Sequence, residues 1–389
     1  MEKKKIVFVL ARFLDGGMET VLVEYLRHLS KMQTYELTLA IAYHMGELEV
    51  YHDRVPKDVR ITYLVHHPWL VKYKKQRPPS RAVKLFDELL INPIRRGIQA
   101  YHLHQLTKRA DAIVDFDHSQ SSFLKSVSIP KIAFFHGSLA GLFEQDPREG
   151  KRQQRKIHVY DHIVTISQAM YREACHYFPQ AKDKLCMVYN TVDVETLEQL
   201  SRATVDDERI KHPFILSVTR LEENAKDVTT LIAAYQILRQ QYGHEEELYV
   251  IGKGDSLLQL QEKARDCGME EYVHFLGFMA NPFPWVSKCQ IFVHSAKSEG
   301  LPTNIIEALL LDKMIVATDC PTGPREILNG GKAGILTPVG DKAALAKAMH
   351  EALTNKELQE RIAEGRKQHR PNFVFETAGK VFCKLLESK

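Results

Sequence analysis

Short apolar runs alternate with amphipathic stretches along most of the chain, a pattern typical of strands and helices that follow one another. In the first half, the predicted strands are Ile6–Leu10, Glu36–Ala42, Ile113–Phe116, Ile132–Phe135 and Ile163–Ile166. In the second half, they are Phe214–Val218, Leu248–Ile251, Val273–Leu276, Ile291–His294, Met314–Ala317 and Ile335–Leu336. Strands and helices in alternation form βαβ units, so the pattern predicts an α/β protein with parallel sheets.

A polar stretch near the middle of the chain separates the two series of strands. We therefore expect two Rossmann-like doubly wound lobes facing a cleft, residues 1–195 and 213–370, joined by a linker over residues 196–212. Apolar residues at helical spacing after Pro371 predict a C-terminal helix, within residues 371–389, that returns toward the first lobe. Ligands of such sheets bind at the carboxyl ends of the strands, so the strand-to-helix turns are the expected places for chemistry.

The composition narrows the class of protein. The chain has 389 residues, of which 44% are hydrophobic and 26% charged, as in ordinary globular proteins, and this excludes a disordered or fibrous chain. A net charge of +4 is too small to indicate nucleic acid as the partner. The six cysteines show no C-x-x-C spacing, which disfavours a zinc site, and we expect them to be reduced.

The start of the chain does not read as a targeting segment. The apolar run Ile6–Ala11 is broken by Arg12, which leaves it short for a signal peptide, and no later run approaches the length of a membrane span. We therefore expect a cytoplasmic protein.

The most informative segment is Ser298–Leu309, which follows the predicted strand Ile291–His294 directly. Pro302 suits the first helical position, so the backbone N–H groups around Gly300 would point out of a helix N-terminus toward phosphate or sugar oxygens. Glu299 precedes this helix, and Glu307 follows a little more than one turn into it.

Two glutamates eight positions apart around Gly-Leu-Pro resemble the pattern of family-four retaining glycosyltransferases of the GT-B fold, of the type that builds bacterial envelope glycans. The resemblance extends along nearly the whole chain. It includes the segments Gly16–Glu19, Asp161–Ser167, Val188–Asp193, Ser217–Leu221 with Lys226, Val250–Asp255, Asp319–Leu328, Gly334–Leu336 and Gly340–Asp341. Two positions depart from the family pattern: Thr219 stands where glycine is usual, and Ala225-Lys226-Asp227 stands where Lys-Gly is common.

The resemblance implies roles for these residues. Glu307 would bind the ribose hydroxyls, and Glu299 the transferred sugar. Gly300 and Leu301 belong to the same donor-binding turn. His136 corresponds to a family histidine near the sugar, which makes it the second catalytic candidate with a role in polar positioning.

Physical reasoning supports further donor-binding residues. The leaving nucleotide diphosphate gains negative charge as the glycosidic bond breaks, so fixed cations such as Arg220 and Lys226 would stabilise it. Gly16 and Gly17 would let the backbone approach the donor closely, because a Cβ would intrude. The leaving phosphate can take the acceptor proton itself, so neither a metal nor a cofactor is expected besides the nucleotide sugar.

Structural explanations compete with these roles. The glutamates could be solvated helix-end carboxylates, Arg220 and Lys226 a solvated strand-end pair, and the paired glycines a simple turn. His136 could be a satisfied buried histidine. Gly252 and Gly254 are interpreted as a tight turn without a catalytic role.

Residues 66–110 carry a local charge of +8, with two acids, Asp87 and Glu88, against ten basic residues. The basic residues are Lys72, Lys74, Lys75, Arg77, Arg81, Lys84, Arg95, Arg96, Lys108 and Arg109. Trp69, Tyr73, Phe86, Leu89 and Leu90 are interleaved with them. This pattern suits an interfacial segment on an anionic membrane, and a solvated basic helix face is the alternative.

The sequence therefore predicts a retaining glycosyltransferase that moves a hexose or N-acetylhexosamine from a nucleotide diphosphate sugar, with UDP as the expected nucleotide. The expected acceptor is a lipid-linked or lipopolysaccharide- or capsule-type glycan, and the protein would be peripheral on the inner face of the plasma membrane. A sugar-nucleotide 2-epimerase of the same architecture is the alternative. A nucleic-acid-binding module is disfavoured because the basic segment lacks an aromatic stacking platform.

Overall fold

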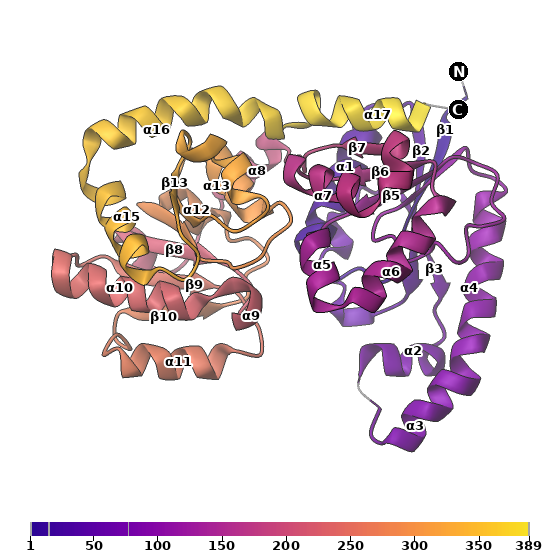
Figure 1. The fold of residues 1–389 in the computed structure, drawn as a ribbon, viewed down its shortest axis with the longest axis horizontal. Helices are drawn as coiled ribbons and strands as arrows, with labels where there is room; N and C mark the ends of the chain where they lie inside the picture. The colour runs from indigo at the N-terminus through magenta and orange to yellow at the C-terminus, as the bar shows by residue number, and fades with distance from the viewer. Residues whose placement is uncertain (1, 15, 77, 388–389) are drawn as a thin grey trace. The chain divides into compact units, whose positions relative to one another are not determined.

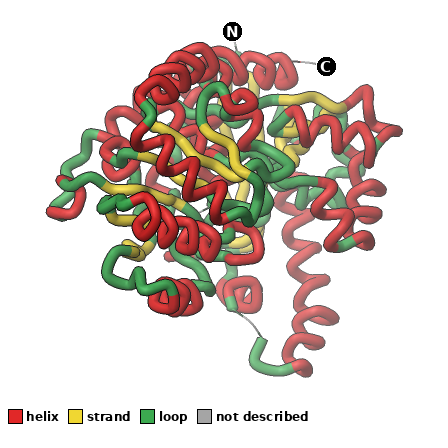
Figure 2. The backbone as a smooth tube through the Cα atoms, turned by 60° about the vertical axis from the view of Figure 1, so that its left-hand side comes forward, coloured by secondary structure: helices red, strands yellow, loops and turns green. Residues whose placement is uncertain are grey.

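The computed structural model describes residues 2–14, 16–76 and 78–387, and the chain divides into two compact units (Figure 1). Unit 1 contains the chain up to Ile166, Tyr171–Thr191 and the C-terminal segment from Gly379. Unit 2 contains Ser167–Met170 and Val192–Ala378. Each unit is built around a parallel sheet with helices packed against it (Figure 2).

The sheet of unit 1 has the strand order β3-β2-β1-β4-β5-β6-β7 among the described residues. The strands are β1 Lys4–Leu10, β2 Tyr35–Tyr43, β3 Arg60–Val65, β4 Ala112–Asp115, β5 Lys131–Phe135, β6 His162–Thr165 and β7 Leu185–Met187. The apolar run of β1 lies in the interior of the sheet and pairs in parallel with β2 and β4. The strand order reverses between β1 and β4, and doubly wound sheets bind ligands at such a switch point.

The helices of the N-terminal half connect these strands, and one C-terminal helix belongs to the same unit. They are α1 Gly17–Lys31, α2 Pro68–Lys75, α3 Arg81–Phe86, the π-helical turn η3 Asp87–Ile91, α4 Asn92–Thr107, α5 Leu139–Gln145, α6 Pro147–Lys156, α7 Gln168–Tyr177 and α17 Lys380–Glu387. On α17, Phe382 packs against Phe8, Tyr25 and Phe134, with ring centroids 4.8 to 6.2 Å away. The predicted return of the C-terminal helix to the first lobe is therefore confirmed.

The sheet of unit 2 repeats the same winding, in the order β10-β9-β8-β11-β12-β13. Its strands are β8 Phe214–Val218, β9 Glu247–Ile251, β10 Val273–Gly277, β11 Ile291–His294, β12 Met314–Thr318 and β13 Ile335–Thr337. Its helices are α8 Val194–Ser201, α9 Glu223–Lys226, α10 Val228–Tyr242, α11 Leu257–Asp266, α12 Phe283–Lys288, α13 Thr303–Leu310, α14 Pro324–Ile327, α15 Lys342–Thr354 and α16 Lys356–His369. The switch point here lies between β8 and β11.

The predicted strands all exist, and β8 and β11 have the predicted bounds. Two edge strands, β3 and β7, were not predicted, because β3 exposes Arg60 and is only partly buried, and β7 has three residues. The predicted C-terminal helix is interrupted before α17 by a 3₁₀ turn, Arg370–Phe373, and a π turn, Phe375–Gly379. Within the described ranges, no helix combines the length and apolar character needed to cross a membrane.

Candidate functional site

The turn between β11 and α13 brings Glu299 into contact with Lys226, the last residue of α9, and with His294, the last residue of β11. Glu299 Oε1 lies 2.5 Å from Lys226 Nζ and 3.0 Å from His294 Nε2. The side chains of Lys226 and Glu299 are each 11% exposed, and that of His294 is 2% exposed. These residues flank the β8–β11 switch point, which places the predicted Lys226 and Glu299 in one polar cluster and adds His294 to it.

The cluster keeps Glu299 ionised. Burial raises the pKa of Glu299, but the contacts with His294 and Lys226 outweigh it and bring the pKa to about 2. On the other side of the histidine ring, Asn304 Nδ2 lies 3.3 Å from His294 Nδ1 and donates to the carbonyl of Val218 at 2.7 Å. An amide N–H facing Nδ1 leaves the proton on Nε2, which lies beside the carboxylate without an aligned hydrogen bond to it.

The first turn of α13 supports the expected helix N-terminus. Pro302 occupies the N-cap position rather than the first helical position, with ψ of 112°, and makes no side-chain cap. Asn304 Oδ1 accepts from the backbone N–H of Ile305 at 2.9 Å. Gly300 and Leu301 are buried immediately before it. Glu307 lies on the second turn and is partly buried. Backbone N–H groups at such a helix N-terminus favour oxygens of a phosphate or sugar.

The departure from the family pattern at Asp227 has a structural explanation. Asp227 adopts φ of 50° and ψ of 47°, a left-handed conformation that favours glycine and that aspartate also tolerates. Its carboxylate lies 3.1 Å from Lys297 Nζ, and the backbone N–H of Lys297 donates to the carbonyl of Ala225 at 2.8 Å. These contacts fix α9 against the turn that carries Glu299.

A second turn, which contains Thr322 and Gly323, packs against the turn that carries Glu299. Gly323 has φ of 92°, and a Cβ there would meet Pro302 Cδ at 2.5 Å and the carbonyl oxygen of Gly300 at 3.0 Å. The hydroxyl of Thr322 donates to the carbonyl of Glu299. The segment Asp319–Leu328 therefore holds the Glu299 turn in place, a role that sequence reasoning did not assign.

Arg220 follows β8 and remains exposed. Its Nη1 lies 3.1 Å from Glu222 Oε1. The turn after β9 packs closely on this segment, because Cβ atoms at Gly252 and Gly254 would lie 1.8 Å from the oxygen of Thr219 and 2.3 Å from that of Leu221. The two glycines thus permit a close approach beside Arg220, which the interpretation as a simple tight turn had not included.

In unit 1, Gly16 precedes α1 as its N-cap and Gly17 begins the helix. Gly16 has an extended backbone, with φ of −90°, a conformation that does not require glycine. A Cβ at Gly16 would instead meet Glu19 Oε2 at 2.6 Å, and Glu19 Oε1 accepts from the backbone N–H of Leu14 at 3.2 Å. The absence of a side chain at Gly16 leaves room for this buried carboxylate.

His136 follows β5, on the same edge of the sheet. Its Nε2 donates to the carbonyl of Phe116 at 2.8 Å, which leaves Nδ1 as an acceptor in the neutral ring. Burial lowers the pKa of His136 to about 3, with a further lowering from His118 and an opposing effect of the hydrogen bond to Phe116. The side chain is therefore neutral near pH 7 and is suited to accept a hydrogen bond rather than to donate a proton as an acid.

The end of β4 adds polar groups that the sequence analysis did not identify. Asp117 Oδ2 accepts from the backbone N–H of Ala11 at 2.8 Å, and the His118 ring stacks on Phe135 with centroids 4.3 Å apart. Asp115 is fully buried and accepts from Tyr160 Oη at 2.5 Å. Burial, and then the charge of Asp117, raises the pKa of Asp115 well above its usual range.

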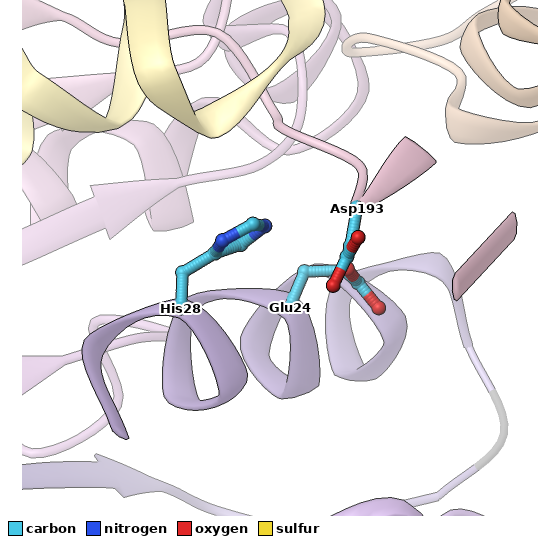
Figure 3. Close-up of side chains that lie close together, drawn as sticks. All are labelled: Glu24, His28 and Asp193. Atoms are coloured by element: carbon cyan, nitrogen blue, oxygen red, sulfur yellow. The ribbon is translucent and has the colours of Figure 1, made fainter. Parts of the chain in front are cut away.

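Further buried polar side chains lie on α1. Glu24 and His28 project from consecutive turns of this helix (Figure 3), and Glu24 Oε1 lies 2.5 Å from Arg27 Nη1. Asp193, which belongs to unit 2, caps α8 by accepting from the backbone N–H of Thr196 at 3.3 Å. These local contacts give Glu24 and Asp193 structural partners within their own helices.

Comparisons with known proteins identify the family. The family profile described as Glycosyltransferase Family 4 matches residues 15–196, and that described as Glycosyl transferases group 1 matches residues 204–369. With a match in each half and two doubly wound sheets, the chain belongs to the family-four glycosyltransferases of the GT-B fold.

Individual relatives support this membership. An uncharacterized glycosyltransferase of Methanocaldococcus jannaschii is 32% identical over 43% of this chain and 42% of its own. A Campylobacter jejuni enzyme named N-acetylgalactosamine-N,N'-diacetylbacillosaminyl-diphospho-undecaprenol 4-alpha-N-acetylgalactosaminyltransferase is 28% identical over 51% of this chain and 52% of its own. The matched part of the chain thus spans about half the length of these two curated relatives.

A solved structure shows the same fold. Anabaena HepE, solved in complex with UDP and glucose, superposes with a TM-score of 0.76 at 18% identity, over 99% of this chain and all of that one.

Proposed function

We propose that the protein is a retaining glycosyltransferase that moves a hexose or N-acetylhexosamine from a nucleotide diphosphate sugar, expected to be UDP-linked, to a lipid-linked or lipopolysaccharide- or capsule-type glycan. The observation that carries the proposal is the contact of Lys226 with Glu299, which lies shortly before the first turn of α13. A fixed carboxylate can accept hydrogen bonds from sugar hydroxyls, and an ammonium group and backbone N–H groups can bind phosphate oxygens.

In the proposed reaction, the bond between C1 of the sugar and the leaving phosphate breaks, and the acceptor oxygen bonds to C1 on the same face. The acceptor proton passes to an oxygen of the leaving phosphate. Arg220 and Lys226 stabilise the charge that grows on the diphosphate, so no metal is required. Because Arg220 is exposed and pairs with Glu222, a diphosphate can displace that carboxylate.

The test is a donor panel on the full chain with UDP-, GDP- and ADP-linked sugars, scored by released nucleotide and by the shift of the melting temperature. We expect a response to a UDP-linked sugar and transfer to a lipid-linked acceptor with the anomeric configuration kept. Release of an epimerised sugar without acceptor would instead establish the 2-epimerase. Absence of any response from folded protein, with acceptor and vesicles present, would contradict the proposal.

The metal independence has its own measurement. Turnover should be unchanged after treatment with EDTA and after dialysis into metal-free buffer. A loss that Mg²⁺ or Mn²⁺ restores would contradict this part of the proposal while leaving the transfer reaction intact.

Membrane association is also proposed, through α2, α3 and α4. The helical rod from α3 to α4 extends beyond the sheet of unit 1 (Figure 1), and it exposes an apolar stripe. The stripe consists of Leu85, Phe86, Leu89, Leu90 and Ile94. The predicted basic residue Arg77 lies outside the described residues. Lys72, Lys75, Arg81 and Lys84 are exposed near this stripe in the sequence.

An exposed apolar stripe with flanking cations suits an anionic bilayer surface, because its apolar side chains can enter the headgroup boundary. In co-sedimentation, the full chain should bind vesicles that contain anionic lipid more strongly than it binds neutral vesicles. Leu89→Glu should weaken this binding. Indifference to both lipid charge and Leu89→Glu would contradict the association.

A further inference from the structure

The guanidinium of Arg95 on α4 is fully buried and only partly paired. Its Nη2 contacts Asp87 Oδ1, whereas Nε and Nη1 find no acceptor among the residues that the structure describes. Arginine remains charged at any physiological pH, and a buried N–H without an acceptor is costly. The local structure therefore holds a cation whose hydrogen-bonding capacity exceeds what its neighbours supply.

Other cations lie around the same point. Lys74 on α2 places Nζ 5.3 Å from the centroid of the Tyr43 ring. Burial lowers the pKa of Lys74, and the charge of Arg95 lowers it further, followed by that of Arg12. Asp87 and Glu88 oppose this effect. Arg96 also acts on Tyr43, so four cations face two acids, and the balance leaves an excess of positive charge.

The position in the fold is that of a ligand site. Arg12 follows β1, Tyr43 ends β2, and Lys74 lies on the helix that follows β3, so all three are at the carboxyl edge of the sheet. One turn along α4 from Arg95, Gln99 accepts from Tyr43 Oη at 3.3 Å and donates to Gln120 at 2.5 Å. This buried network fixes the face of α4 that carries Arg95.

We propose that Arg95, Lys74 and Arg12 bind a phosphoryl group, and that this group is the phosphate or diphosphate of an amphiphilic acceptor. Nε and Nη1 lie on different edges of the guanidinium, so a ligand with several oxygens satisfies them better than a single carboxylate does. The same helical rod carries the exposed apolar stripe, which matches a hydrocarbon chain attached to the phosphoryl group. The inference rests on the proposed function in that the ligand is the acceptor.

The test is equilibrium binding of inorganic pyrophosphate, geranyl diphosphate and geraniol to the full chain, with UDP present to occupy donor-binding residues. Geranyl diphosphate should bind at least tenfold more tightly than pyrophosphate, and geraniol should bind weakly. Lys74→Gln and Arg12→Gln should each weaken binding of geranyl diphosphate about tenfold, the loss expected for one charge-assisted contact. Lys57→Gln is the matched control, because Lys57 is exposed and precedes β3 at the opposite edge of the sheet.

Arg95→Lys tests the central residue and keeps its charge, with a melting curve to confirm folding. If this variant does not fold, Lys74→Gln and Arg12→Gln decide the outcome alone. Equal affinity for pyrophosphate and geranyl diphosphate would overturn the amphiphilic ligand. Binding that is unchanged in both Lys74→Gln and Arg12→Gln would overturn the site. A failure of the proposed function shows separately, as silence in the donor panel.

Discussion

Lys226 and Glu299 are 73 positions apart in the chain, yet their Nζ and Oε1 atoms lie 2.5 Å apart in a largely buried site. The pair joins the turn after β8 to the turn after β11, on the two sides of the switch point in the second sheet. His294 approaches the same carboxylate oxygen at 3.0 Å, so the negative charge of Glu299 has two partners.

Lys226→Met should destabilise unit 2 by about 3 kcal/mol, because it removes one partner of a buried ion pair and leaves the carboxylate behind. The double variant Lys226→Met/Glu299→Gln should recover part of that loss. Urea denaturation of the four proteins of the cycle measures the coupling. Strictly additive losses would show that the pair does not stabilise the fold.

Arg220→Ala should lower turnover about 100-fold or more, the loss typical for removal of a group that stabilises a developing charge. Because the side chain of Arg220 is exposed, the melting temperature of the variant should differ little from that of the parent protein. Arg202→Ala is the control, since Arg202 is likewise exposed and pairs with a glutamate, Glu198. Parallel losses of turnover and stability in Arg220→Ala would favour a structural role.

Glu307→Ala should also lose most turnover while the fold is retained, because Glu307 is only partly buried on α13. If Glu307 binds the donor's ribose, the variant's KM for the donor should rise more than its KM for the acceptor. Steady-state kinetics with each substrate varied in turn check this. A loss of melting temperature as large as the loss of activity would contradict it.

Gly323→Ala should destabilise the protein by about 1 kcal/mol or more. Both the positive φ of Gly323 and its close contact with Pro302 exclude a Cβ. Gly330→Ala is the matched control. Gly330 also has a positive φ, 64°, but no atom lies within 4 Å of its added Cβ. Weaker donor binding in Gly323→Ala than in Gly330→Ala would link the contact to the site, and equal effects would reduce it to backbone strain.

The neutral state of His136 predicts a pH dependence of stability. The folded pKa is about 3 and the ordinary value 6.5, so below pH 6.5 the unfolded chain binds a proton that the folded chain does not. The free energy of unfolding should therefore fall by about 1.4 kcal/mol per pH unit below 6.5 because of this group. His136→Gln should remove that part of the slope.

The comparison of His136→Gln with the parent protein is best made between pH 7 and pH 5. Glu299 acts in the opposite region: its stabilisation is full above about pH 4.5 and is lost as the pH falls toward 2. Groups that do not interact with His136 contribute equally to both proteins and cancel in the difference. Parallel curves for the two proteins would contradict the neutral histidine.

The sequence predicted the strand series well because buried parallel strands are continuous apolar runs, as in β1 and β11. It failed at β3 and β7, where edge position leaves strands short or half-exposed. For the site, local spacing pointed to Glu299 and Lys226, but the long-range approach of His294 was not visible. A polar residue at the last position of a buried strand was the only available signal for it.

The glycines also separate what local sequence predicts from what only the folded structure shows. Paired glycines before α1 suggested a ligand, whereas the structure shows Gly16 making room for Glu19. Gly323 stands in a segment that sequence comparison marked as family-like, yet its packing against Pro302 depends on two turns brought together by the fold. Such contacts depend on three-dimensional register, which no local pattern encodes.

The π-helical turn Asp87–Ile91 changes the angular positions of the residues that follow it in the helical rod from α3 to α4. In a regular α-helix, residues eight apart point about 80° away from each other around the axis, and a turn that absorbs one extra residue reduces this to about 20°. Asp87 and Arg95 are eight apart and form an ion pair across this turn. If the same residues formed a regular α-helix, the two charges would point about 80° apart and the guanidinium would turn away from its neighbours, so the extra residue of the π turn sets where the rod directs its charge.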